Sequence, residues 1–115
     1  MRNLRFLLLL MLITPFVVHA DNGISVKRGF ITGNTFRALD QPSKNVYATG
    51  LVDGILLAPF YGAPEERLNN FERCTAGMTG QQIVAIFEKH LKENPERWHH
   101  DMHIIAFSAL REACK

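Results

Sequence analysis

The residues from 98 to 103, Trp-His-His-Asp-Met-His, form a dense group of possible metal ligands. On a helix, His99 and His103 would lie one turn apart, a spacing that lets two imidazoles bind one metal ion. Zinc needs three or four ligands, however, and the other nearby candidates, Glu96 and His100, would lie at different angles around the helix axis. We therefore favour a solvent-exposed first helical turn here, and we predict neither a metal site nor a cofactor.

Other reactive residue types do not combine into a catalytic motif. Gly50-x-x-x-Gly54 is not followed by the Lys-Ser/Thr of a phosphate-binding loop, so its glycines are expected to let another helix approach closely. Glu65 and Glu66 are sequence neighbours and are expected to be solvated, while His90 falls on an apolar helical stripe and is typical of a core histidine. No Gly-x-Ser-x-Gly turn presents a serine nucleophile. We predict a binding protein with no catalytic residues.

The first twenty residues have the pattern of an export signal. Arg2 and Arg5 precede an apolar run at 6–13, and Val18-His19-Ala20 places small residues before a cleavage point. A membrane anchor is the alternative, but about 20 apolar residues are needed to span a bilayer, and Thr14-Pro15 interrupts the run. We predict a signal peptide at 1–20 that is cleaved off on export to the bacterial periplasm.

Residues 21–115 are then the mature chain, which we expect to form a single domain. The whole chain has 13 Lys and Arg against 11 Asp and Glu, and two of the basic residues lie in the predicted signal. The mature chain therefore carries eleven of each and no net formal charge. Without a basic cluster it lacks the electrostatic surface that nucleic-acid or anionic-membrane binding needs. We predict neither partner.

Apolar periodicity and capping patterns predict an all-α fold, a small bundle of about four helices. Residues 21–33 are compatible with either an edge strand or an ordered coil. The stretch Ile104-Ile105-Ala106-Phe107 is apolar on nearly every side, so its helix is central or covered by a partner. The predicted helices are a short turn from Asn34, a helix from Ser43 to Pro59, one from the Thr79-Gln82 capping box, and one from Asn94-Pro95 to about Ala113.

Cys74 and Cys114 are the two cysteines of the chain. A tight turn at Asn94-Pro95 would make the last two helices antiparallel, so the start of the third helix would lie beside the C-terminal end of the fourth. The two cysteines would then lie just outside these two ends. In an oxidising compartment such a pair is more often a disulfide than a thiol site. We predict that this bond closes the bundle.

Residues 59–78 have no sustained period and are the longest stretch expected to be irregular. They combine aromatic with charged side chains, a mixture that is favoured in protein interfaces. The alternative is an ordinary loop whose aromatic side chains fold back onto the core. The candidate partner-binding residues are Phe60, Tyr61, Glu65, Glu66, Arg67, Phe71 and Arg73.

Several segments in fixed order resemble the Rap/Tai family of immunity proteins from type VI secretion systems. They are Ile31-Thr32-Gly33-Asn34, Val46-Tyr47-Ala48-Thr49-Gly50-Leu51-Val52-Asp53-Gly54, Cys74, Thr79-Gly80-Gln81-Gln82-Ile83-Val84, Leu91-Lys92-Glu93-Asn94-Pro95-Glu96, and Ala109-Leu110-Arg111-Glu112-Ala113-Cys114. The chain departs from many relatives because it has no second cysteine pair near residues 39–47.

The resemblance implies a helical periplasmic protein that binds and blocks a cognate secreted toxin, in several cases a peptidoglycan amidase. Members often form homodimers, which would suit the all-round apolar segment at 104–107. The alternative function is a small acid-stress or chaperone-like periplasmic protein, in which protonated histidines would open the domain to clients.

Overall fold

A computed structural model describes residues 25–115; the predicted signal peptide and its cleavage point lie outside them. Within this range all regular secondary structure is helical, apart from one isolated bridge between Thr32 and Asp101. The all-α prediction is confirmed, with five α-helices in place of four. In order they are α1 (Gly33–Ala38), α2 (Gln41–Leu56), the 3-10 turn η1 (Ala58–Tyr61), α3 (Glu66–Thr75), α4 (Gly80–Glu93), the 3-10 turn η2 (Pro95–Arg97) and α5 (Met102–Ala113).

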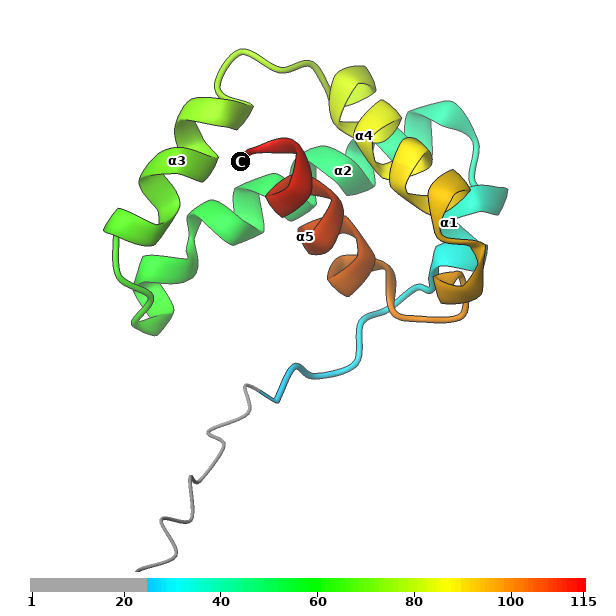
Figure 1. Cartoon of the computed structure of the whole chain (residues 1–115), viewed down its shortest axis with the longest axis horizontal. Helices are drawn as coiled ribbons and strands as arrows, with labels where there is room; N and C mark the ends of the chain where they lie inside the picture. The colour runs from blue at the N-terminus through cyan, green and yellow to red at the C-terminus, as the bar shows by residue number, and fades with distance from the viewer. Residues whose placement is uncertain (1–24) are drawn as a thin grey trace, which may run out of the picture.

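Helix α4 is the centre of the packing, with α2 and α5 against it (Figure 1). Its residues Ile83, Phe87 and Leu91 recur every fourth position, so they form one apolar stripe. This stripe packs in one core with Ala48 and Val52 of α2 and with five buried residues of α5. The buried core comprises Phe36, Ala48, Val52, Ile83, Val84, Phe87, Leu91, Met102, Ile105, Ala106, Ala109 and Leu110.

Short helix α1 is fixed to the segment between α4 and α5 through backbone contacts. The N–H groups of Gly33 and Asn34 donate to the carbonyls of His100 and Trp98, at 3.0 and 2.8 Å. A methyl group on Gly33 would lie only 2.9 Å from the Trp98 carbonyl oxygen. The absence of a side chain at Gly33 therefore sets how closely α1 and this segment approach.

Three predicted helix starts were displaced. Thr32, and not Asn34, caps α1, and its hydroxyl accepts the Thr35 N–H. Asp40 caps α2 by accepting the N–H of Ser43, so the helix begins before Ser43. Asn94-Pro95 starts only η2, because Asn94 makes no side-chain cap. In contrast, the capping box of Thr79 and Gln82 is present.

The prediction that residues 59–78 are irregular was largely wrong, because most of η1 and the ten-residue helix α3 lie within them. Helix α3 has no side-chain N-cap and buries little more than Leu68, Phe71 and Thr75 on one side. Its start signal and its apolar stripe are therefore both weak. Residues 25–31, the described part of the undecided segment, are an irregular coil.

The predicted disulfide joins Cys74 to Cys114, with a Cα–Cα distance of 5.6 Å. It connects the last turn of α3, a helix that was not expected, to the end of α5. Residues 94–101 separate α4 from α5, and this linker replaces the predicted tight turn. The two helices cross, and Glu112 near the end of α5 lies beside His90 in the C-terminal half of α4, not beside the start of α4.

The pair Gly50 and Gly54 does not contact a neighbouring helix, contrary to expectation. A Cβ at either position would meet no atom within 4 Å. Both glycines are exposed, whereas the residues that α2 buries are Ala48 and Val52. Within residues 25–115, no helix combines the length and the apolar character needed to cross a membrane.

The two helical glycines Gly33 and Gly50 should respond oppositely to alanine. Gly33→Ala should lower the free energy of unfolding by about 1–3 kcal/mol, because the added methyl group meets a backbone carbonyl. Gly50→Ala has open space and should raise it by about 0.5–1 kcal/mol through helix propensity. Urea unfolding of both variants measures the two signs; a stabilised Gly33→Ala variant would contradict the close approach.

Loss of the disulfide should weaken the whole domain. The bond spans 40 residues, so replacing Cys74 and Cys114 together by serine should lower the free energy of unfolding by about 4 kcal/mol. Urea unfolding of the oxidised parent and the double variant gives this difference. The parent unfolded in the presence of a reductant is the control. Equal urea midpoints for the oxidised parent and the variant would show that the disulfide does not stabilise the domain.

Candidate functional site

An aromatic projection follows α2, and we call Leu57, Phe60 and Tyr61 the aromatic tip. The exposed fractions of Phe60 and Tyr61 are 87% and 90%, and Leu57 is half exposed. Backbone hydrogen bonds hold the projection in a 3-10 turn, and Gly62 at φ 90° reverses the chain after it. Gly62 accepts this left-handed conformation because it has no Cβ. The aromatic rings are thus presented on an ordered turn and not on a free loop.

The other predicted interface residues lie on α3 or at its start. Glu65, Glu66, Arg67 and Arg73 are exposed, and Arg73 donates to the Asn70 side chain. Phe71 is different, because it is half buried and packs against the core. The structure therefore divides the predicted aromatics: Phe71 folds back, while Phe60 and Tyr61 face solvent. The contact of this surface with a partner stays a prediction.

A second feature is a hollow between α1, α2, α4 and η2, with a volume of about 470 Å³. We call it the cationic pocket. Its apolar part is formed by Leu91, Pro95 and Trp98, and its charged part by Arg37, Lys44, Lys92 and Glu88.

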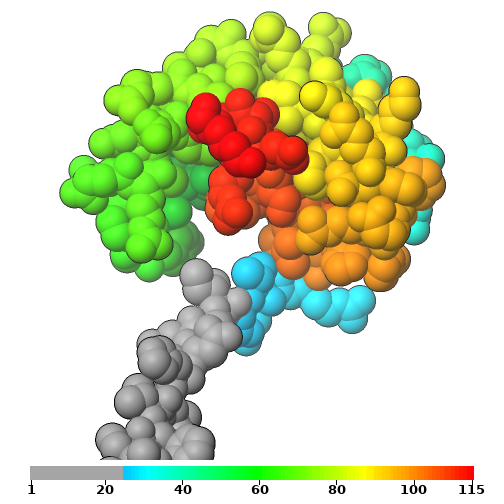
Figure 2. All heavy atoms as spheres, in the orientation of Figure 1, coloured from blue at the N-terminus to red at the C-terminus, as the bar shows by residue number. Residues whose placement is uncertain are grey.

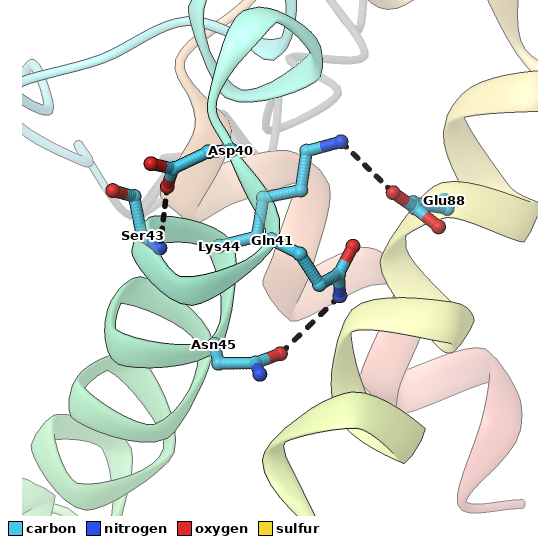
Figure 3. Close-up of polar contacts among 6 residues, drawn as sticks. All are labelled: Asp40, Gln41, Ser43, Lys44, Asn45 and Glu88. Atoms are coloured by element: carbon cyan, nitrogen blue, oxygen red, sulfur yellow. Dashed lines mark hydrogen bonds and ion pairs between the residues drawn. The ribbon is translucent and has the colours of Figure 1, made fainter.

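Three side-chain contacts hold the wall of the cationic pocket. The Lys44 ammonium lies 3.0 Å from a Glu88 carboxylate oxygen and links α2 to α4 (Figure 3). The Arg37 guanidinium lies over the Trp98 ring at 3.3 Å from its centroid, a cation–π geometry. The Trp98 indole N–H donates to the Leu91 carbonyl at 2.6 Å, which fixes the ring.

The histidine group at 99–103 is dispersed. His99 and His100 are exposed with ring centroids 4.4 Å apart, while His103 is half buried beneath Gly29. Helix α5 begins only at Met102, so His99 and His103 do not share a helix. In the described part of the chain, no three His, Cys, Asp or Glu side chains are grouped so that they could hold a metal ion.

Two side chains have shifted pKa values, and both shifts arise from the fold. Hydrogen bonds from Ser43 lower the pKa of Asp40, the cap of α2. Burial, and to a lesser extent the charge of Asp101, raises the pKa of Tyr47 to about 12. Tyr47 packs against Phe36 in the core and stays protonated at physiological pH. Neither shift creates a group that titrates near neutrality.

Sequence reasoning missed the cationic pocket altogether. Arg37 and Trp98 are far apart in the chain, and only the folding of α1 onto the linker brings them together. Lys92 lies in the last turn of α4, where a basic side chain is favoured by the helix dipole and gives no indication of a pocket. The one local signal is a tryptophan beside charged residues in 96–101, a segment whose histidines suggest metal binding first.

Comparison with known proteins gives one result. Residues 27–114 match the sequence profile of the family described as Rap1a immunity proteins, a range that includes all five α-helices and both cysteines. The comparisons with curated proteins and with solved structures give no match. Since the matched range is most of the chain, this protein belongs to the Rap1a immunity protein family.

Proposed function

We propose that residues 21–115 form a periplasmic immunity protein that neutralises a cognate type VI secretion toxin by binding it. The family match supports an immunity role, and the pattern of residues 1–20 supports export. The Cys74–Cys114 bond suits an oxidising compartment. The protein would act through its surface and not through catalysis.

The exposure of the aromatic tip is the main reason for proposing it as the surface that contacts the toxin. Two aromatic rings with 87% and 90% of their area exposed are unusual on a folded domain, and such rings are enriched at the centres of interfaces. Leu56, which is partly exposed, extends the apolar surface along the end of α2. The charged residues at the start of α3, including Glu65 and Arg67, lie nearby in the chain and would form a polar rim.

The shape of this surface suits a concave partner. The tip lies at one extreme of the helical domain, at the turn between α2 and α3 (Figure 1). A projecting apolar turn can enter a substrate cleft, and a peptidoglycan amidase must have such a cleft to hold its peptide. We therefore propose a cell-wall hydrolase as the toxin, blocked by occupation of its cleft.

A second copy of the chain is a further proposed partner. Most of the all-round apolar segment of α5 is covered within the chain, since Ile105 and Ala106 are buried. Phe107 stays 46% exposed and Ile104 is half buried. Figure 2 shows a hollow between α5 and the region around residues 56–68. A homodimer would cover Phe107, and the toxin would then meet a paired surface.

Truncation of the aromatic tip should weaken toxin binding. The double variant Phe60→Ala, Tyr61→Ala should bind the toxin at least about 30-fold more weakly, because two interface aromatics are lost. Its melting temperature should stay near that of the parent, since neither ring is in the core. Isothermal titration with the toxin that co-purifies from the native periplasm gives the affinity.

Phe30→Ala is the matched control, because Phe30 is a fully exposed aromatic outside the tip. The control should bind like the parent. Equal affinities for the tip variant and the parent would remove the tip from the interface. Failure of the protein to co-purify with any secreted toxin, or to neutralise one, would contradict the immunity proposal itself.

Export should remove the first twenty residues. The protein recovered from the periplasm should begin at Asp21, because the small residues Val18 and Ala20 define the cleavage point. Intact mass spectrometry of the oxidised protein measures this, and the same spectrum before and after reduction reports the disulfide. Recovery of the full-length chain from the membrane fraction would instead establish an uncleaved anchor.

A further inference from the structure

We propose that the cationic pocket binds an acidic peptide segment of a protein partner, with its carboxylates held by Arg37 and Lys92. The partner that we have in mind is the toxin, and to that extent the inference rests on the proposed function. The preference for an acidic peptide follows from the pocket alone. It can be tested without the toxin.

The charge of the pocket is the first argument. Three basic side chains line it against one acidic side chain, although residues 25–115 as a whole are nearly neutral, with 11 Lys and Arg against 10 Asp and Glu. Glu88 neutralises Lys44, whose side chain is only 13% exposed. Neither Arg37 nor Lys92 has an ion-pair partner among residues 25–115. Two cations thus stay available to a ligand.

The form of the pocket is the second argument. Its volume of about 470 Å³ is within the range of ligand-binding cavities, which is about 300–1,000 Å³. Pro95, Leu91 and Trp98 give it an apolar side next to the two free cations. A short peptide offers both components, because a carboxylate can meet the cations while methylene groups or a neighbouring side chain cover the Trp98 edge.

The location of the cations favours a carboxylate peptide over a phosphate group. Arg37 lies in the last turn of α1 and Lys92 in the last turn of α4. Helix C-termini present carbonyl groups and a negative dipole end, which oppose a phosphate with a charge of about −2 more strongly than a carboxylate with a charge of −1. Phosphate sites instead typically use backbone N–H groups at helix N-termini. Two free cations are also fewer than the cluster of about four to eight that anionic membranes require.

The pocket would give the partner a second point of attachment. It lies at the α1 and η2 end of the domain, and the aromatic tip lies at the other end, beside α3 (Figure 1). Charged contacts of this kind steer association and fix orientation more than they add affinity. The tip and the pocket would therefore contribute differently to one complex.

The single tryptophan of the chain lies in this pocket, so it reports directly on occupancy. The experiment titrates residues 21–115 with tetraglutamate blocked at both ends, and follows Trp98 fluorescence and the NMR signal of its indole N–H. We expect a saturable change in both signals that weakens as salt is raised. Blocked tetralysine should give no saturable change.

Lys92→Glu is the test variant, and Lys89→Glu is its matched control on the same helix. Both variants change the net charge equally, but Lys89 does not line this pocket. Lys92→Glu should weaken tetraglutamate binding at least about tenfold, and Lys89→Glu by less than about threefold. Circular dichroism checks that both are folded, and the milder Lys92→Gln should give an intermediate affinity.

Three outcomes would overturn the proposal: no saturable change with tetraglutamate, equal weakening by the two glutamate variants, or saturation by inorganic phosphate at the same concentration. None of these outcomes depends on toxin neutralisation. If the protein binds tetraglutamate but no toxin, the pocket proposal stands and the immunity proposal fails. The two failures are therefore distinguishable.

Discussion

The close approach of α1 to the linker between α4 and α5 is the constraint on which much of this structure depends. A six-residue helix has little stability of its own, so α1 persists through contacts with the rest of the chain. Gly33 makes those contacts possible because, without a Cβ, it lets its own N–H donate to the His100 carbonyl and the Asn34 N–H donate to the Trp98 carbonyl. The same contact places Arg37 over Trp98 and Phe36 in the core against Phe87. Packing of the core and formation of the cationic pocket thus share one origin.

The parts of the fold that were predictable are those with a strong local signal. The α4 stripe recurs every fourth residue and follows a capping box, so its type and its start were both correct. Helix α3 escaped prediction because Glu65 gives no cap and because few of its residues are apolar; packing and the disulfide stabilise it instead. The glycines of α2 show the opposite error, since Gly50 and Gly54 were assigned a contact that the fold does not make.

The parts of the candidate site that could be predicted are those whose residues are neighbours in the sequence. Phe60 and Tyr61 stood out as neighbouring aromatics in a segment with breaks, and they are exposed. Phe71 belongs to the same segment, but its orientation depends on the register of α3, which the sequence did not reveal. The cationic pocket depends on residues from four elements. Its recognition required the crossing of α4 and α5 and the linker that accompanies it, neither of which follows from periodicity.

The position of Cys114 has a consequence for the order of folding. This residue directly follows α5, the last helix described, whereas its partner Cys74 ends a helix in the middle of the domain. If the chain is exported as we propose, it emerges from its N-terminus, so α1 to α4 are present before the disulfide can form. Helix α3, which buries little of itself, is therefore tethered by this bond only after α5 has emerged. Before that point the aromatic tip would lie on a loosely held segment, so the toxin binding that we propose for the tip would reach full strength only once the disulfide has formed.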